Sequence, residues 1–161
     1  IPDASRPEVV AERERLSEVT HGSLWAGIAR LATASHLGEV GAAIQEHIES
    51  QGTYGILRDY VGHGIGRKMH EPPTVFNYAT CERESDVRPG LVVAIEPMVV
   101  AGDQATFVED DDWTVTTIDG SAGSHWEHSV AVHDGGIWVL TAHDGGAAGL
   151  APFGGVPVPI P

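Results

Sequence analysis

The first fifty residues carry apolar positions at the spacing of helices. Apolar side chains recur about every 3.6 residues from Val9 to Leu31 and again from Val40 to Ile48. The stretch from Ser5 to Glu8 has the form of an S-x-x-E capping box with a proline in the first turn. Gly52 is typical of a position just past a helix end. The pattern predicts two helices, the first starting at the capping box and the second ending before Gly52, parted by a break at residues 36–38.

The pattern changes after Gly52, where glycine and proline become frequent and apolar residues gather in short runs. Turn residues such as Arg88-Pro89-Gly90 bound these runs, as is typical of β-strands. The predicted strands are 55–60, 91–100, 113–118, 126–132 and 137–141. Two helices followed by mostly antiparallel strands indicate an α+β fold, and we assign it to a domain of residues 1–142. The Gly- and Pro-rich tail, residues 143–161, is predicted either to meander or to be disordered.

The chain is strongly acidic, with 23 Asp and Glu residues against 9 Lys and Arg among 161, a formal net charge of −14. This balance argues against binding to nucleic acid or to an anionic membrane surface, because both need a basic surface. No apolar run approaches the roughly 20 residues of a membrane-spanning helix. A single cysteine, Cys81, and the lack of a secretory signal pattern indicate a reducing compartment, so we expect a cytoplasmic protein.

The run from Leu91 to Val100 is apolar almost throughout but contains one carboxylate, Glu96, followed by Pro97. An unpaired carboxylate is costly to bury, so such a group is normally paired, neutralised or bound to a metal ion. The proline holds Glu96 extended and removes a donor from the strand, which suits a strand that bends where its carboxylate is aimed. From this run alone, a site carboxylate and an exposed glutamate at a strand end fit equally well.

Three glycines surround His63 in the segment Gly62–Pro73, which has the sequence GHGIGRKMHEPP. Glycine permits close approach of backbone or ligand, so His63 can serve as a metal ligand, and the following His70 can serve a substrate. The spacing matches neither a zinc finger, nor a helical H-x-x-x-H site, nor a dinucleotide-binding loop. A glycine-rich turn with two exposed histidines also explains the segment.

A third segment, Ser124 to Val132, places Glu127 in a predicted strand. Strand alternation puts Glu127 on the face of Ser129 and Ala131, two small residues that leave room around a carboxylate. His125 shares that face, so His125 and Glu127 can form a cluster. A solvated glutamate on a half-exposed strand is the plainer interpretation of this segment alone.

Together the three segments supply one histidine, His63, and two glutamates, Glu96 and Glu127, from separate β elements. Nitrogen and carboxylate ligands of this kind suit Mn, Fe, Co or Zn rather than Cu(I) or iron–sulfur clusters. Carboxylates that can bridge two ions are typical of a two-metal hydrolytic site. Three ligands are too few for two ions, so further ligands must come from elsewhere.

Four motifs, in order, resemble type I methionine aminopeptidases. They are the Gly62–Pro73 segment, Gly90–Met98 (GLVVAIEPM), Asp112–Thr117 (DWTVTT) and His125–Val132 (HWEHSVAV). The opening helix, with Leu24-Trp25-Ala26-Gly27-Ile28, is also similar to that family, and the likeness covers most of the chain ahead of the tail. The resemblance implies the pita-bread fold, in which two similar α+β halves face each other across a metal site. It implies that this chain is the second half.

The resemblance also assigns roles to particular residues. It implies that His63, Glu96 and Glu127 bind two divalent metal ions (Co, Mn, Fe or Zn) and that Glu96 also handles the proton of the attacking water. His70 would contact the substrate and stabilise the tetrahedral intermediate, and Trp113 would line the methionine pocket. The implied reaction is removal of the N-terminal methionine from polypeptides by a metal-dependent exopeptidase.

Members of the family take two aspartate ligands and a substrate-contacting histidine from the half that precedes this region. Asp3 lies at the start of the chain and Asp110 to Asp112 lie in a predicted loop, so none has the right context. We therefore expect a fragment that needs its N-terminal half and is inactive alone. The expected partners are polypeptides that begin with methionine, with association with the ribosome as a further possibility, and we expect no nucleic acid and no membrane.

Three other interpretations stay open. A proline-directed aminopeptidase or dipeptidase shares the fold, but the residues around Glu127 and the run Gly66–His70 favour the methionine enzyme. A pita-bread module that has lost its chemistry and binds a protein partner is a second interpretation. An unrelated small β-rich metal-binding protein is a third, and it does not explain four motifs in family order.

Overall fold

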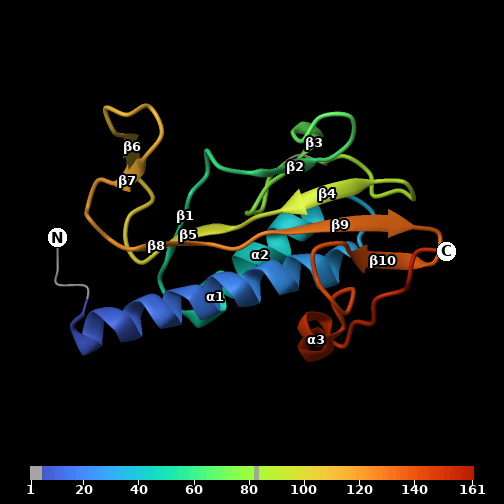
Figure 1. The fold of residues 1–161 in the computed structure, drawn as a ribbon, viewed down its shortest axis with the longest axis horizontal. Helices are drawn as coiled ribbons and strands as arrows, with labels where there is room; N and C mark the ends of the chain where they lie inside the picture. The colour runs from blue at the N-terminus through green and yellow to red at the C-terminus, as the bar shows by residue number, and fades with distance from the viewer. Residues whose placement is uncertain (1–4, 82–83) are drawn as a thin grey trace.

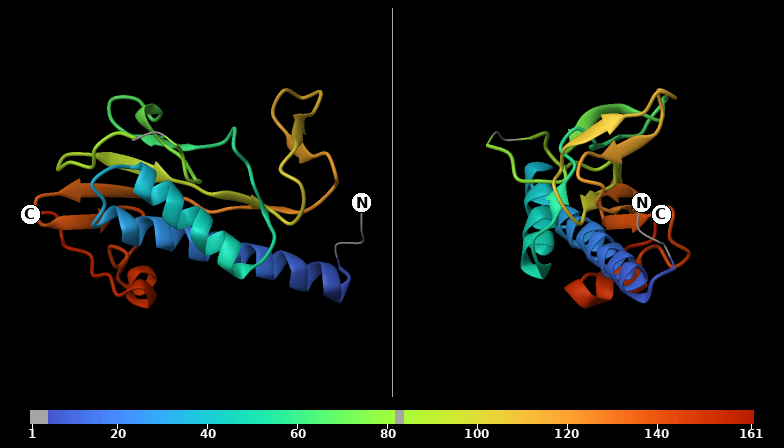
Figure 2. Two further views of the ribbon diagram at one scale, coloured as in Figure 1. Left: turned by 180° about the vertical axis from the view of Figure 1, so that it is seen from behind. Right: turned by 90° about the vertical axis from the view of Figure 1, so that its left-hand side faces the viewer.

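A computed structural model describes residues 5–81 and 84–161, which form a layer of two long helices covered by β-sheets (Figures 1 and 2). The helices are α1 (Pro7–Leu31) and α2 (Gly38–Gln51), which pack against each other, and both were predicted. The predicted cap of α1 is wrong. The N-cap residue is Arg6, without a capping side-chain bond, and the carboxylate of Glu8 pairs with the Arg6 guanidinium. Asp3 lies outside the described residues.

The strands of the described residues form three antiparallel sheets. A five-stranded sheet has the order β10-β9-β4-β2-β3, a three-stranded sheet has the order β1-β5-β8, and β6 pairs with β7 alone. The bounds are β1 Gly55–Ile56, β2 Gly62–Gly64, β3 Glu71–Val75, β4 Val92–Ile95, β5 Met98–Val100, β6 Thr106–Val108, β7 Val115–Thr117, β8 Gly123–His125, β9 His128–His133 and β10 Gly136–Val139. This arrangement is the α+β architecture that the sequence predicts.

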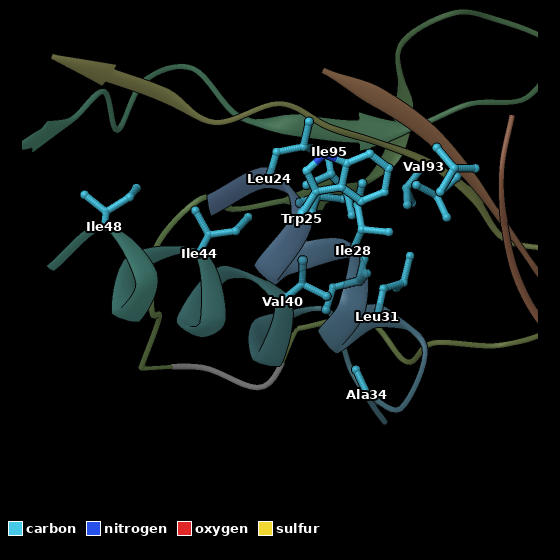
Figure 3. Packing of buried hydrophobic residues seen from close by; sticks show 14 of the residues in the cluster. Leu24, Trp25, Ile28, Leu31, Ala34, Val40, Ile44, Ile48, Val93 and Ile95 are labelled. Carbon is cyan, nitrogen blue, oxygen red and sulfur yellow. The ribbon is translucent and has the colours of Figure 1, made fainter. Parts of the chain in front are cut away.

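The core lies between α1 and the two larger sheets. Leu24 and Ile28 of α1 and Ile44 of α2 are fully buried and pack with strand residues such as Val93 and Ile95 (Figure 3). Helix α1 contacts β4, β5 and β8, so one helix supports strands of both sheets. Burial of these apolar side chains, each contributing about 1.5–3 kcal/mol, fixes the two sheets relative to each other. Among the described residues, none of the helices has both the length and the apolar character needed to cross a bilayer.

The strand predictions miss the glycine-rich and polar strands. The segment Gly62–Pro73, which we treat above as a possible turn, contains β2 and the start of β3, and β6 and β8 were not predicted. The predicted run 91–100 is divided into β4 and β5, which belong to different sheets. Its division at Glu96 and Pro97 is the bend that the proline predicts.

The Gly- and Pro-rich tail meanders over the domain and packs against α1 and β10. It contains helix α3 (Ala147–Leu150) and a single 3-10 turn (Ala151–Phe153), and Leu150 is 1% exposed within the core. Gly149 lies against Trp25 so closely that an added Cβ would be 2.1 Å from the indole ring. Further along, the Val158 N–H donates to the carbonyl of Ile137 at 2.9 Å, which covers the outer edge of β10.

The substitution Leu150→Ala tests whether the tail contributes to stability. Removing this buried side chain should lower the free energy of unfolding by about 2–5 kcal/mol, because a cavity is left against α1. Val156→Ala, in the exposed part of the same tail, is the matched control and should cost less than about 0.5 kcal/mol. Urea denaturation measures both, and equal unfolding midpoints for the two variants would contradict the packing.

Candidate metal centre

Two neighbouring segments of the chain connect the five-stranded sheet to the three-stranded sheet, and they lie side by side. The chain passes from β4 to β5 through Glu96, and from β8 to β9 through Glu127. The pairs Ile95–His128 and Met98–His125 flank this crossing on either side. The two glutamates are therefore opposite each other at the junction of the sheets, where no regular ladder occupies their backbone.

A buried asparagine holds the junction, and the sequence analysis missed it. Asn77 is fully buried, and its Nδ2 donates to the carbonyl oxygens of Tyr60 at 3.1 Å and Glu96 at 3.3 Å. Pro97 lacks an N–H, so the strand cannot continue its ladder at this residue. The Asn77 side chain therefore donates the hydrogen bond to the Glu96 carbonyl where the strand ladder is interrupted. A polar residue next to the apolar Val75 and Phe76 was the available signal, but its partners are distant in sequence.

His63 lies in β2, directly beside Glu96. The flanking glycines are required, because a Cβ on Gly62 would be 2.3 Å from the carbonyl oxygen of Ala94 and a Cβ on Gly64 2.3 Å from that of Pro72. The His63 Nδ1 lies 3.0 Å from the carbonyl of Gly64, which can only accept, so Nδ1 carries the proton. The lone pair of Nε2 is left free, 3.3 Å from Glu96 Oε1, as a metal ligand requires.

The other two predicted site residues, His70 and Trp113, lie in different parts of the structure. The rings of His70 and His63 have centroids 4.3 Å apart, so the exposed His70 lies next to the predicted metal ligand His63. Trp113 lies in the loop between β6 and β7 and is 86% exposed. Among the described residues, its indole makes no hydrogen bond or ring contact with the other predicted residues. The pocket role of Trp113 stays a prediction.

Three potential ligand atoms gather on one side of the junction. One ligand atom each from Glu96, His125 and Glu127 lie within 4.8 Å of one another. His125 Nε2 is 3.4 Å from Glu96 Oε2, so each oxygen of Glu96 faces an imidazole. In the described part of the chain, no Lys or Arg forms an ion pair with either glutamate. A divalent cation suits this set of carboxylate and imidazole donors.

Aromatic side chains hold the segment between β8 and β9, which contains Glu127, against helix α1. The Trp126 indole N–H donates to Ser17 Oγ at 3.0 Å, and its ring centroid is 4.6 Å from that of His21. Trp25 packs against His128 at 4.9 Å. Burial lowers the pKa of both histidines, and the proximity of His21 lowers the pKa of His128 further, against the opposing charge of Asp144. The histidines next to the segment that contains Glu127, His21 and His128, therefore favour the uncharged form.

A hollow of about 530 Å³ opens beside His125. Its wall is made by β5, β8 and the β6–β7 hairpin, with apolar side chains such as Val99 and Val115 and the polar rim of Thr116 and Ser121. Concave, largely apolar surfaces next to polar groups are typical of ligand sites. An apolar group can therefore lie close to the candidate metal centre.

Comparisons with known proteins agree with this geometry. The sequence model of metallopeptidase family M24 matches residues 3–134. A methionine aminopeptidase of Clostridium acetobutylicum is 43% identical over 134 residues, which are 83% of this chain and 53% of that protein. The crystal structure of a methionine aminopeptidase from Thermotoga maritima is 40% identical and superposes with a TM-score of 0.77, over 82% of this chain and 53% of the other.

A prolidase from Pyrococcus horikoshii has the same fold, with a TM-score of 0.58 over 82% of this chain and 32% of the other, but it is only 20% identical. The likeness to that protein shows the fold alone. The chain spans about half the length of the curated relatives it matches. These matches confirm the family resemblance and the pita-bread fold of which this chain corresponds to the second half.

Asn77→Ala should loosen the candidate metal centre. The carbonyls of Tyr60 and Glu96 lose their donor, which should cost about 1–3 kcal/mol of stability. Affinity for Co²⁺ should fall about tenfold, because the backbone that orients Glu96 is released. Gln45→Ala, which removes an exposed hydrogen bond to the Ala79 N–H, is the control. Thermal unfolding and calorimetric titration measure the effects, and unchanged Co²⁺ affinity in Asn77→Ala would refute the orienting role.

Proposed function

The chain belongs to metallopeptidase family M24, and from this we propose that the protein removes the N-terminal methionine from polypeptides as a metal-dependent aminopeptidase. One observation carries the proposal. Glu96 and Glu127 lie opposite each other at the sheet junction with His63 beside them, and His70 is in contact with His63. The candidate metal ligands and the candidate substrate-binding histidine thus lie close together, which supports the proposal.

His63, Glu96 and Glu127 are the proposed metal ligands. Imidazole and carboxylate donors suit Co, Mn, Fe or Zn, and we propose that two divalent ions bind, as a carboxylate with two free oxygens allows. When bound, the ions supply Lewis acidity at the scissile amide. The family resemblance places two further aspartate ligands outside this chain, so we propose that they come from a preceding half.

The side chains of this chain have separate tasks in hydrolysis. The Glu96 carboxylate accepts the proton of the attacking water and passes it to the departing amine, which needs a carboxylate held within hydrogen-bond reach. His70 donates a hydrogen bond where negative charge develops on the amide oxygen. Its ring is exposed, so a substrate can reach it. Trp113 is proposed to contact the methionine side chain once the substrate is bound.

The proposed substrates are polypeptides with methionine first and a small second residue. Nascent chains make the ribosome a proposed partner, and the cytoplasm the proposed location. A proline-directed peptidase is the alternative within the fold. The sequence identity of 40% to a methionine aminopeptidase, against 20% to a prolidase of similar coverage, supports the methionine enzyme. All three proposed metal ligands are present in this chain, which supports a catalytic protein over a module that only binds a protein partner.

The first test compares peptide substrates with the protein supplied with Co²⁺ or Mn²⁺, both as the 161-residue chain and joined to the preceding half of a relative. Methionine should be released from Met-Ala-Ser by the joined protein and not by the chain alone. Alanine should not be released from Ala-Pro-Ser. Glu96→Gln should lower kcat by several orders of magnitude, on the order of 10²–10⁴, because the proton acceptor is lost. Preferred cleavage of Ala-Pro-Ser would instead identify a proline-directed peptidase.

A pair of histidine variants separates binding of metal from binding of substrate. His63→Ala should lower the metal content of the purified protein, because a ligand beside Glu96 is lost. His70→Ala should leave the metal content near that of the parent but lower kcat/KM about 10²-fold or more, because a donor to the developing charge is lost. Elemental analysis and steady-state kinetics measure both. The reverse pattern would mean that the two roles are exchanged.

A further inference from the structure

The ring of His125 faces the proposed metal centre, and its contacts differ from those of the two following histidines in the chain. His128 is bonded through Nδ1 to Thr141 Oγ1 at 2.7 Å, and His133 through Nε2 to the carbonyl of Val158 at 2.9 Å. Among the described residues, no such partner holds the His125 ring, and the side chain is 40% exposed. Its Nε2 is directed at Glu96 Oε2.

The distance between these two atoms favours a shared ion over a hydrogen bond. His125 Nε2 and Glu96 Oε2 are 3.4 Å apart, longer than the usual 2.7–3.2 Å of an N–H···O bond. Two ligand atoms bound at about 2.1 Å to one tetrahedral ion are separated by about 3.4 Å. Glu127 brings a third ligand atom into the same group.

The backbone already holds His125 in this position. It is the last residue of β8 and pairs with Met98, two residues beyond Glu96. Trp126, the next residue, is tied to Ser17 of α1. Within the described residues, no Lys or Arg forms an ion pair with either carboxylate, so a cation would offset their mutual repulsion.

We propose that His125 is a metal ligand, and that His125, Glu96 and Glu127 together hold one divalent transition-metal ion with residues of this chain alone. The inference rests on the proposed function for its metal centre, but it adds a ligand to the three that the family resemblance implies. Glu96 would then join two ligand groups, with His63 at Oε1 and His125 at Oε2.

Two substitutions distinguish a metal ligand from a residue that only donates a hydrogen bond to Glu96. His125→Gln keeps an N–H donor but replaces the imidazole by a weak ligand. His125→Asp supplies a ligand oxygen but cannot donate. His143→Gln, at an exposed histidine of the tail, is the matched control. All four proteins are titrated with Co²⁺ by calorimetry after circular dichroism has confirmed their fold.

We expect His125→Gln to bind Co²⁺ at least about tenfold more weakly than the parent, and His125→Asp and His143→Gln to remain closer to it. In proton NMR spectra of the Co²⁺-bound chain, a ligating imidazole gives a strongly shifted, exchangeable N–H signal. One such signal should be lost in His125→Gln and in His125→Asp, and retained in His143→Gln.

Retention of all shifted N–H signals in the two His125 variants would overturn the proposal, as would a Gln variant that binds like the parent or a chain that binds no Co²⁺. Methionine release by the joined protein is measured separately. A failed ligand assignment with intact methionine release leaves the proposed function standing, whereas loss of methionine release with intact Co²⁺ binding counts against the function alone.

Discussion

At the junction of the two larger sheets, neighbouring strands leave their regular hydrogen-bonded pairing side by side, at Glu96-Pro97 and at Trp126-Glu127. Such a break leaves backbone groups without ladder partners, which is costly inside a protein unless they are satisfied. Asn77 donates to the Glu96 carbonyl, and the Trp126 N–H reaches the carbonyl of Pro97 at 3.5 Å. Helix α1 contacts strands on both sides of the break. These contacts keep the two breaks side by side. The carboxylates of Glu96 and Glu127 therefore lie close together at the candidate site instead of being part of a regular strand.

Much of the fold could be predicted because local pattern and tertiary packing agree in it. Helices α1 and α2 end within a few residues of the predicted positions, since their apolar faces are also the faces they bury. Strands β2 and β8 could not be predicted in this way. Both contain glycine and histidine rather than β-branched residues. In β2, the neighbours of Gly62 and Gly64 leave room only for a bare backbone, and β8 is a strand because it pairs with β5. Their pairing depends on residues far away in sequence.

The candidate site, like the fold, has residues that the local sequence could predict and residues that it could not. His63, Glu96 and Glu127 were predicted because their motifs combine unusual local features, such as a carboxylate and a proline in an apolar strand. The importance of His125 depends on the register between β5 and β8, and that of Asn77 on two carbonyls 17 and 19 residues away. Strand alternation could place His125 beside Glu127, but nothing local could place it at the second oxygen of Glu96.

The β6–β7 hairpin has a mechanical consequence. In the part of the chain that the structure describes, its strands pair only with each other. The Asp119 carboxylate joins the two ends of the hairpin by accepting from the N–H groups of Asp103 and Ser121. These bonds lower the pKa of Asp119 to about 2. Asp111 orders the tip by accepting from the N–H groups of Trp113 and Thr114. The hairpin is thus held together by hydrogen bonds within itself, from its base at Asp119 to its tip at Asp111. Among the described residues, β6 and β7 share no ladder with the sheet that contains β4, so the backbone bonds that position Glu96 do not run through the hairpin that carries Trp113.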